Sequence, residues 1–138
     1  MTSKVSGLVL LALASAGCAP SIVSSPLGES LTLRVGQSAE IRGEGLSVGL
    51  SAIRDDSRCP PPETGIVCIW EGVATAVAWA SKQPQGRSEL ILHTSDNGGF
   101  SRRAEYLDYE IQVLGLEPQR SREIAQSEYR LSLVVRRR

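Results

Sequence analysis

Residues 55–72 carry most of the side chains in this chain that could do chemistry. The stretch reads DDSRCPPPETGIVCIWEG, so two cysteines, four carboxylates and a tryptophan lie close together around three consecutive prolines. Thiols form disulfides or bind metals, and carboxylates bind cations or transfer protons. The spacing of these groups decides which of those chemistries the sequence permits.

Cys59 and Cys68 are predicted to form a disulfide rather than a metal site. Structural zinc sites pair cysteines two to four residues apart, and catalytic zinc sites use histidine. Here eight residues separate the two cysteines, and His93 is the only histidine. In an exported protein the disulfide is the expected state. Closing a loop of this length stabilises a fold by about 2.5–3 kcal/mol, and by less where prolines already restrict the unfolded chain.

The carboxylates near the cysteines do not predict a metal or cofactor site. Asp55, Asp56 and Glu63 could offer oxygen ligands to calcium. Arg54 and Arg58 flank the aspartates, however, and carboxylates beside arginines in turns are usually solvated ion pairs. We therefore expect no bound metal and no cofactor.

Catalysis is not predicted either. Nucleophilic catalysis needs a base placed against a serine or thiol. Ser95 lies two residues from His93, but strand alternation puts His93 on one face with Arg87 and Glu89, in solvent. Neither an H-E-x-x-H pair nor a phosphate-binding glycine loop occurs. The sequence therefore predicts a protein that is not an enzyme and has no catalytic residue.

Two interpretations of residues 55–72 stay open. Residues 60–62 are prolines without the amide hydrogen that a central strand needs, so a loop at the end of a sheet is expected. Trp70 is expected on the same face as the disulfide, packed against its sulfur atoms. The loop is then either a closed cover over the core or a preorganised binding loop. As a binding loop it would use Asp55, Asp56, Arg58, Glu63 and Trp70.

The elements that position this loop are predicted to be strands. Apolar residues alternate with polar ones in five separate runs, which is typical of antiparallel strands with one wet face. Gly-, Pro- and Asn-containing turns separate them, and residues 119–129 offer no more than one helical turn. We therefore predict an all-β fold, an antiparallel, immunoglobulin-like β-sandwich of about seven short strands. The alternating runs are 31–35, 46–52, 87–94, 108–113 and 129–135.

Residues 66–80 are predicted to form the central strand. Both faces of this run are largely uncharged, and only Glu71 interrupts it. Either one long strand crosses the sheet, or a bulge at Glu71 and Gly72 lets Trp70 and Val73 share a face. The alternating alanines from residue 74 to residue 80 indicate that another layer approaches closely.

Residues 1–17 are predicted to be a signal peptide. One cation, Lys4, precedes an unbroken apolar and small run from Val5 to Gly17. This run is too short for a transmembrane helix and has the size of a secretory signal. Export is therefore expected, and the alternative is a buried helix.

The end of the signal permits two cleavage sites. Cleavage after Ala16 would release a soluble periplasmic or secreted protein. Residues 15–18 (SAGC) instead resemble the bacterial lipobox, in which the cysteine is acylated, although the first position is Ser15 where that motif prefers leucine. Lipidation of Cys18 would account for the odd cysteine, and a free or intermolecular thiol is the alternative. Ala19 in place of aspartate then indicates the outer membrane in a Gram-negative cell.

The remaining chain divides into a tether and one domain. Residues 18–29 are small and polar and are expected to be a flexible tether, and residues 30–138 the β-sandwich domain. The chain has 15 basic and 15 acidic side chains, which argues against nucleic acid as a partner. Attachment to the membrane is expected through lipid at Cys18, and residues 136–138, all arginine, are expected to be a solvated end.

Residues 56–60 (DSRCP), 68–70 (CIW) and Gly72 resemble the core of a group of small, uncharacterised bacterial exported proteins and lipoproteins. The resemblance covers roughly residues 31–135, and many members have a small residue where Glu71 stands. It implies a β-rich exported domain and no particular activity.

The expected protein is a lipoprotein of the bacterial cell envelope. Its sandwich domain would be a non-catalytic binding or structural module, with an envelope protein or a glycan as possible partner. The alternative is a secreted hydrolase or protease inhibitor that acts through the disulfide loop, residues 55–72.

Overall fold

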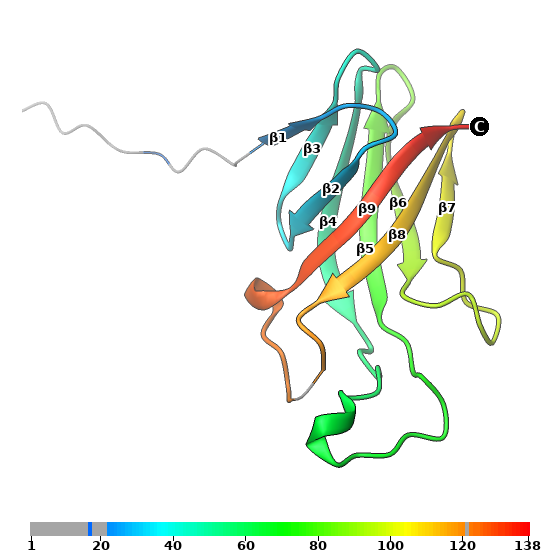
Figure 1. The fold of residues 1–138 in the computed structure, drawn as a ribbon. Helices are drawn as coiled ribbons and strands as arrows, with labels where there is room; N and C mark the ends of the chain where they lie inside the picture. Colours follow the sequence, from blue (N-terminus) through cyan, green and yellow to red (C-terminus); the bar gives the residue numbers. More distant parts are fainter. Residues whose placement is uncertain (1–16, 18–21, 121) are drawn as a thin grey trace, which may run out of the picture.

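The computed structural model describes residues 17, 22–120 and 122–138, and these form a sandwich of two β-sheets (Figure 1). The five-stranded sheet has the order β1 (Ile22–Ser25), β3 (Ser38–Ile41), β4 (Leu46–Arg54), β5 (Thr75–Lys82) and β6 (Gly86–His93). The four-stranded sheet has the order β2 (Ser30–Arg34), β9 (Arg130–Arg137), β8 (Tyr109–Glu117) and β7 (Arg103–Tyr106). Neighbouring strands are antiparallel, apart from the parallel pair β1 and β3.

This arrangement confirms the predicted all-β architecture. The described helical segments are two short 3-10 turns, η1 (Pro62–Thr64) and η2 (Gln126–Glu128). None of the described residues belongs to a helix with the length and apolar content that a membrane span requires. Cys18 and the predicted signal peptide, apart from Gly17, lie outside the described residues.

The alternating runs form strands because each buries one row of side chains between the two sheets. In β2, Leu31 and Leu33 are buried, whereas their neighbours in the strand are exposed. The same alternation runs through β8, whose Tyr109, Ile111 and Val113 are each at most 1% exposed. Burial of such side chains from both sheets supplies the main driving force for folding.

The alanine row faces the core, as the sequence indicates. Ala76, Ala78 and Ala80 on β5 are at most 3% exposed and belong to one apolar cluster with residues of both sheets. Larger side chains from the facing sheet, such as Leu131 and Leu133, are members of the same cluster. Small side chains on one layer therefore meet large ones on the other, which keeps the interior densely packed.

The prediction of a strand from residue 66 is wrong, because β5 begins at Thr75. Residues 66–74 belong to a loop, in which Val67 and Ile69 are 93% and 102% exposed. The predicted bulge at Glu71 and Gly72 does not occur there, and the irregularity of this sheet lies in β4. An uncharged run has the same sequence pattern whether both faces are buried or both are exposed.

The predicted flexible tether is folded over part of its length. Residues 22–25 form β1, and Ser25 O accepts a hydrogen bond of 2.9 Å from Arg42 N. Gly28 N donates to Val135 O in the other sheet at 2.8 Å. The described part of residues 18–29 is therefore attached to the domain by backbone hydrogen bonds, which its small and polar composition did not predict.

We expect Gly49→Ala to destabilise the domain. Gly49 on β4 is paired with Trp79 on β5, and a methyl group on it would lie 2.2 Å from Trp79 Cε2. The indole would have to move off the strand, so the free energy of unfolding should fall by about 1–3 kcal/mol in urea denaturation. Gly115→Ala is the control, because no atom lies within 4 Å of its added methyl group. Equal stability of the two variants would contradict this packing.

Candidate binding site

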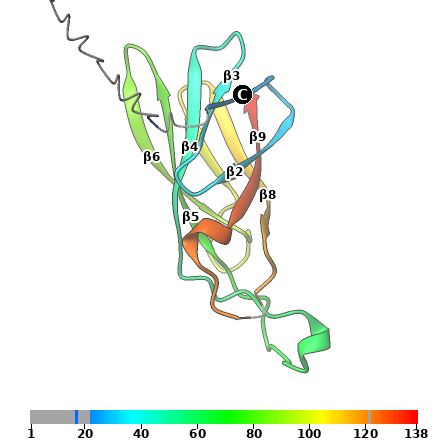
Figure 2. The ribbon, with the colours of Figure 1, turned by 90° about the vertical axis from the view of Figure 1, so that its left-hand side faces the viewer.

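The candidate site lies at one end of the sandwich, where the loop of residues 55–74 joins β4 to β5. Figures 1 and 2 show this loop extending beyond the ends of the strands, while β1 lies toward the opposite end. The neighbouring loop of residues 94–102 joins β6 to β7. These two connections build the site.

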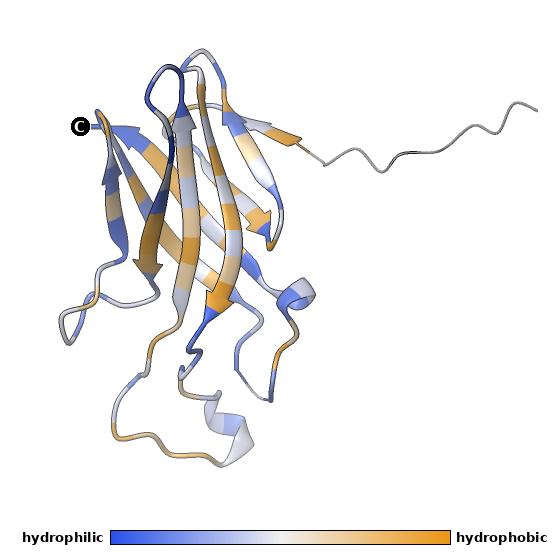
Figure 3. Cartoon of the chain, turned by 180° about the vertical axis from the view of Figure 1, so that it is seen from behind, coloured by the Kyte–Doolittle hydropathy of each residue, from blue (hydrophilic) through white to orange (hydrophobic). Residues whose placement is uncertain are grey.

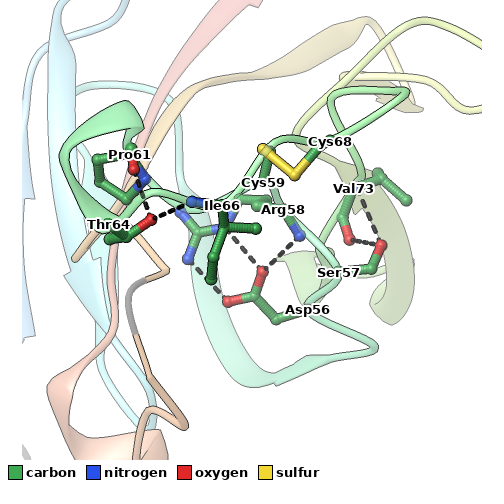
Figure 4. The surroundings of a disulfide bond; sticks show 9 residues. All are labelled: Asp56, Ser57, Arg58, Cys59, Pro61, Thr64, Ile66, Cys68 and Val73. Carbon is green, nitrogen blue, oxygen red and sulfur yellow. Dashed lines mark hydrogen bonds and ion pairs between the residues drawn. A yellow bond between two sulfur atoms is a disulfide. The ribbon is translucent and has the colours of Figure 1, made fainter.

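A disulfide and backbone hydrogen bonds hold the two limbs of the long loop together. Cys59 and Cys68 are joined, with an S–S distance of 2.05 Å and a Cα–Cα distance of 5.9 Å (Figure 4). Ser57 N donates to Val73 O at 2.9 Å, and Cys59 N donates to Glu71 O at 2.8 Å. The predicted cysteine pair is therefore present, and it closes a loop whose backbone is already paired.

Gly72 lets the two limbs approach each other. Its φ is +70°, which glycine adopts without steric penalty, and an added Cβ would lie 1.9 Å from Ser57 O. The Ser57 hydroxyl donates to Val73 O at 3.0 Å, and Val73 N donates to that hydroxyl at 3.2 Å. The contact between the limbs is therefore direct and leaves no space for a side chain at residue 72.

Asp56 and Arg58 attach the loop to the second sheet. Arg58 Nη2 lies 2.8 Å from Asp56 Oδ2, and the two side chains are only 14% and 10% exposed (Figure 4). The same guanidinium donates to Leu116 O at 2.6 Å and to Pro118 O at 2.9 Å, where β8 ends. Tyr129 Oη donates to Asp56 Oδ2 at 3.0 Å. We call Asp56, Arg58 and Tyr129 the clasp.

The clasp shifts two pKa values. Burial raises the pKa of Asp56, but the hydrogen bonds and charge of Arg58, helped by Tyr129, more than offset it and hold that pKa below its ordinary value. Burial and the hydrogen bond to Asp56 raise the pKa of Tyr129 to about 12. Asp56 is therefore ionised and Tyr129 neutral over the physiological range.

The structure does not bring the five predicted binding residues together. Asp56 and Arg58 are engaged within the clasp and serve the scaffold, whereas Asp55 and Glu63 are exposed at separate points of the loop. Trp70 lies beside a pocket, 58% exposed, and not on a strand face that packs on the disulfide. Among the described residues, no cluster of carboxylates, histidine and cysteine could hold a metal ion.

A pocket of about 390 Å³ lies between the two loops and is mainly apolar. One wall comes from the end of the loop of residues 55–74, and the other comes from the loop of residues 94–102. Thr94 and Ala74 join these walls, because Thr94 N donates to Ala74 O at 3.1 Å and Ala74 N donates to Thr94 Oγ1 at 3.0 Å. The lining residues are Trp70, Glu71, Gly72, Val73, Ser95, Asn97, Gly98 and Phe100.

Glu71 supplies the charge in this pocket. Its Oε1 accepts hydrogen bonds from Ser95 Oγ and, at 2.8 Å, from Asn97 Nδ2. These two hydrogen bonds, with a smaller effect of Arg102, hold the pKa of Glu71 below its ordinary value. Within the described part of the chain, no hydrogen bond or ion pair reaches its other oxygen, Oε2. The pocket therefore contains an ionised carboxylate with one oxygen held in place and the other available.

Phe100 and His93 form the aromatic side of the second loop. Their ring centroids lie 4.9 Å apart, and His93 Nδ1 lies 3.3 Å from Ser101 N. His93 lies on the predicted outer face of β6 with Arg87 and Glu89, but it is only partly exposed to solvent because its ring packs against Phe100. Ser95, its predicted neighbour, is 7% exposed and directed to Glu71.

The sequence contains one further serine pattern that is typical of hydrolases, in residues 45–49. Residues 45–49 read GLSVG, which matches the G-x-S-x-G pattern of hydrolases. That motif requires a sharp turn from a strand into a helix. Ser47 instead lies inside β4, between Glu40 on β3 and Ser81 on β5. The motif is a strand segment in this fold.

An exposed apolar ridge continues from the pocket along the disulfide loop. We define the ridge as Ile66, Val67, Ile69 and Trp70, which are 51%, 93%, 102% and 58% exposed. Figure 3 shows the hydrophobic colouring along this loop, outside the sandwich. The sequence signal for the site was present, because Glu71 is the single charge in an apolar run.

Comparisons with known proteins leave the site to be interpreted from its geometry. No family model matches the chain, and no curated protein or solved structure matches it.

We expect Asp56→Asn to lower the free energy of unfolding at pH 7 by about 2–3 kcal/mol, because Arg58 would lose its charged partner in a half-buried position. Urea denaturation measures this, with Glu63→Gln as the control for loss of an exposed loop carboxylate.

The difference in the free energy of unfolding between wild type and Asp56→Asn should depend on pH. The pKa of Asp56 is lower in the folded protein than its unfolded value of about 3.9. The ionised Asp56 therefore contributes its full stabilisation of the fold at pH values above about 3.9. This stabilisation is lost as the pH falls through the lowered pKa. A difference that stays constant throughout the acid range would contradict a stabilising role for the ionised clasp.

Proposed function

We propose that this protein is a lipid-anchored component of the bacterial envelope whose β-sandwich presents a non-catalytic binding site. The observation that carries the proposal is the ridge beside the pocket that contains Glu71. The immunoglobulin-like type of the sandwich stays a prediction.

The ridge supports binding because its exposure is costly and its scaffold is rigid. Soluble domains rarely display contiguous large apolar side chains unless these form a contact surface. Val67 and Ile69 are almost fully exposed, yet the disulfide and the bonds between the limbs hold the loop around them. A restrained loop loses little conformational entropy on binding. The binding interpretation of the loop is therefore favoured over a simple cover.

The polar groups of the pocket favour binding over catalysis. A general base needs a pKa near the working pH, whereas the hydrogen bonds to Glu71 lower its pKa. Ser95 donates its hydroxyl to that weakly basic carboxylate, and His93 lies against Phe100 and the backbone of Ser101. These side chains hold one another in place and do not form an activated nucleophile.

Lipidation at Cys18 would give the ridge a definite orientation. The first described strand, β1, lies toward the end of the sandwich opposite the disulfide loop (Figure 1). A membrane anchor on the N-terminal side would therefore leave the ridge and pocket facing away from the lipid. That placement suits an envelope protein or a glycan as partner.

We expect photocrosslinking from the ridge to capture a partner. The photoreactive residue benzoylphenylalanine replaces Val67 in the full chain, in intact cells, and replaces Ile91 in the control. Ile91 is 45% exposed on β6 and does not belong to the loop that carries the ridge. A partner captured only from position 67 supports the binding function, whereas a protease captured there favours the inhibitor alternative. Equal yields from both positions, or no adduct from position 67, would count against the proposal.

The anchor has its own test. Cells that produce the wild-type chain or Cys18→Ser are fed a fatty-acid analogue, and the purified proteins are compared for label. We expect label on wild type alone, since the variant keeps Cys59 and Cys68 but lacks the acylated sulfur. Equal label on both proteins, or none on either, would exclude lipidation at Cys18.

A further inference from the structure

We propose that the pocket binds a lysine side chain from a partner protein, and that the ridge contacts aliphatic residues next to that lysine. This assignment rests on the proposed binding function and specifies the chemistry of the ligand. It follows from the charge of the pocket, the geometry of its carboxylate and the apolar surface around it.

The charge of the site calls for a cationic ligand. Residues 59–72 contain two acidic side chains, Glu63 and Glu71, and neither lysine nor arginine. Of the cations near the pocket, Arg58 is held in the clasp, and Arg102 donates from Nη2 to Leu114 O at 2.9 Å while its buried Nε has no partner among the described residues. Arg102 influences Glu71 only at longer range, without an ion pair. An ionised carboxylate of this kind is complementary to a positive group.

The geometry of Glu71 favours lysine over arginine. Arginine binds carboxylates best through two parallel hydrogen bonds, one to each oxygen. Ser95 and Asn97 already occupy Oε1, so only Oε2 is open to a ligand. A lysine ammonium is a compact charge that binds a single oxygen well. Ser95 and Asn97 therefore orient the carboxylate, and by occupying Oε1 they also favour an ammonium ligand over a guanidinium.

The walls of the pocket suit the stem of a lysine. Trp70, Val73 and Phe100 line the hollow beside Glu71, and they offer apolar surface to a flexible four-carbon chain. An ammonium near Trp70 or Phe100 would also be attracted to the face of the ring. The pocket thus combines an apolar channel with one charge, as a lysine combines an apolar stem with one cation.

The ridge argues for a protein as the source of that lysine. Ile66, Val67 and Ile69 project apolar surface beyond the pocket, and a free amine would leave it uncovered. A lipid bilayer would cover it too, but anionic membranes attract basic segments, and the charges here are acidic. A partner segment with aliphatic side chains around one lysine fits both features.

The test measures binding of four hexyl compounds to the uniformly ¹⁵N-labelled protein by NMR. Hexylammonium represents the lysine side chain, and hexylguanidinium, 1-hexanol and hexanoate vary the head group on the same stem. We expect hexylammonium to shift the Trp70 indole and amides of residues 71–73 and 95–100. It should bind about two- to fivefold more tightly than hexanol, as expected for one ion pair at an exposed carboxylate. Hexylguanidinium should bind less tightly than hexylammonium, and hexanoate should bind most weakly of the four.

Two matched variants separate charge from packing. Glu71→Gln keeps an acceptor oxygen for Ser95 and Asn97 but removes the charge, so hexylammonium should bind it no more tightly than hexanol. Glu63→Gln removes an exposed loop carboxylate that does not line the pocket, and the preference for ammonium should persist. Trp70→Ala should weaken the binding of all four compounds. Retained dispersion in each spectrum confirms that the variants are folded.

Several results would overturn the assignment. These are equal binding of hexanol and hexylammonium, a preference for ammonium that survives Glu71→Gln, or tighter binding of hexylguanidinium. Binding to anionic phospholipid vesicles through the ridge amides would identify a membrane in place of a protein. Each result concerns ligand chemistry alone, because photocrosslinking from position 67 reports independently on whether any partner binds.

Discussion

The loop end of this domain depends on one guanidinium. Arg58 donates to Asp56 within its own loop and to the carbonyl oxygens of Leu116 and Pro118, where β8 leaves the second sheet. Carbonyl groups at the end of a strand need partners when they are partly buried. Arg58 supplies such a partner from the loop between β4 and β5, so a single side chain connects the disulfide loop to the opposite layer of the sandwich.

That connection lets the rest of the loop be exposed without being loose. The clasp fixes the base of the loop, the bonds of Ser57 and Cys59 pair its limbs, and the disulfide closes its outer part. These restraints act at successive points along the chain, so they limit different motions. The ridge can then display apolar side chains that would otherwise collapse onto the core. The ridge side chains are exposed because these restraints hold the loop in place, whereas their apolar composition alone would favour burial.

The sequence predicted the strands whose pattern is long enough to read. Alternation over five or more residues located β2, β4, β6, β8 and β9, whereas β1, β3 and β7 have four residues each and were missed. The error at residues 66–74 has a different cause. Hydrophobic side chains predict burial, and nothing local shows that Gly72 must turn the chain so that its Cα can approach Ser57 O. The decisive contact lies 15 residues away in sequence.

The same limit applies to the candidate site. Cys59 and Cys68 could be paired by arithmetic, but the roles of Asp56 and Arg58 depend on strand ends about 60 residues further along the chain, which no local pattern reveals. Glu71 was visible as a lone charge, yet its role depends on Ser95 and Asn97, which reach it from another loop. Two donors on one oxygen make the carboxylate asymmetric. That asymmetry sets which cations it can bind, and it exists only after the two loops have been brought together.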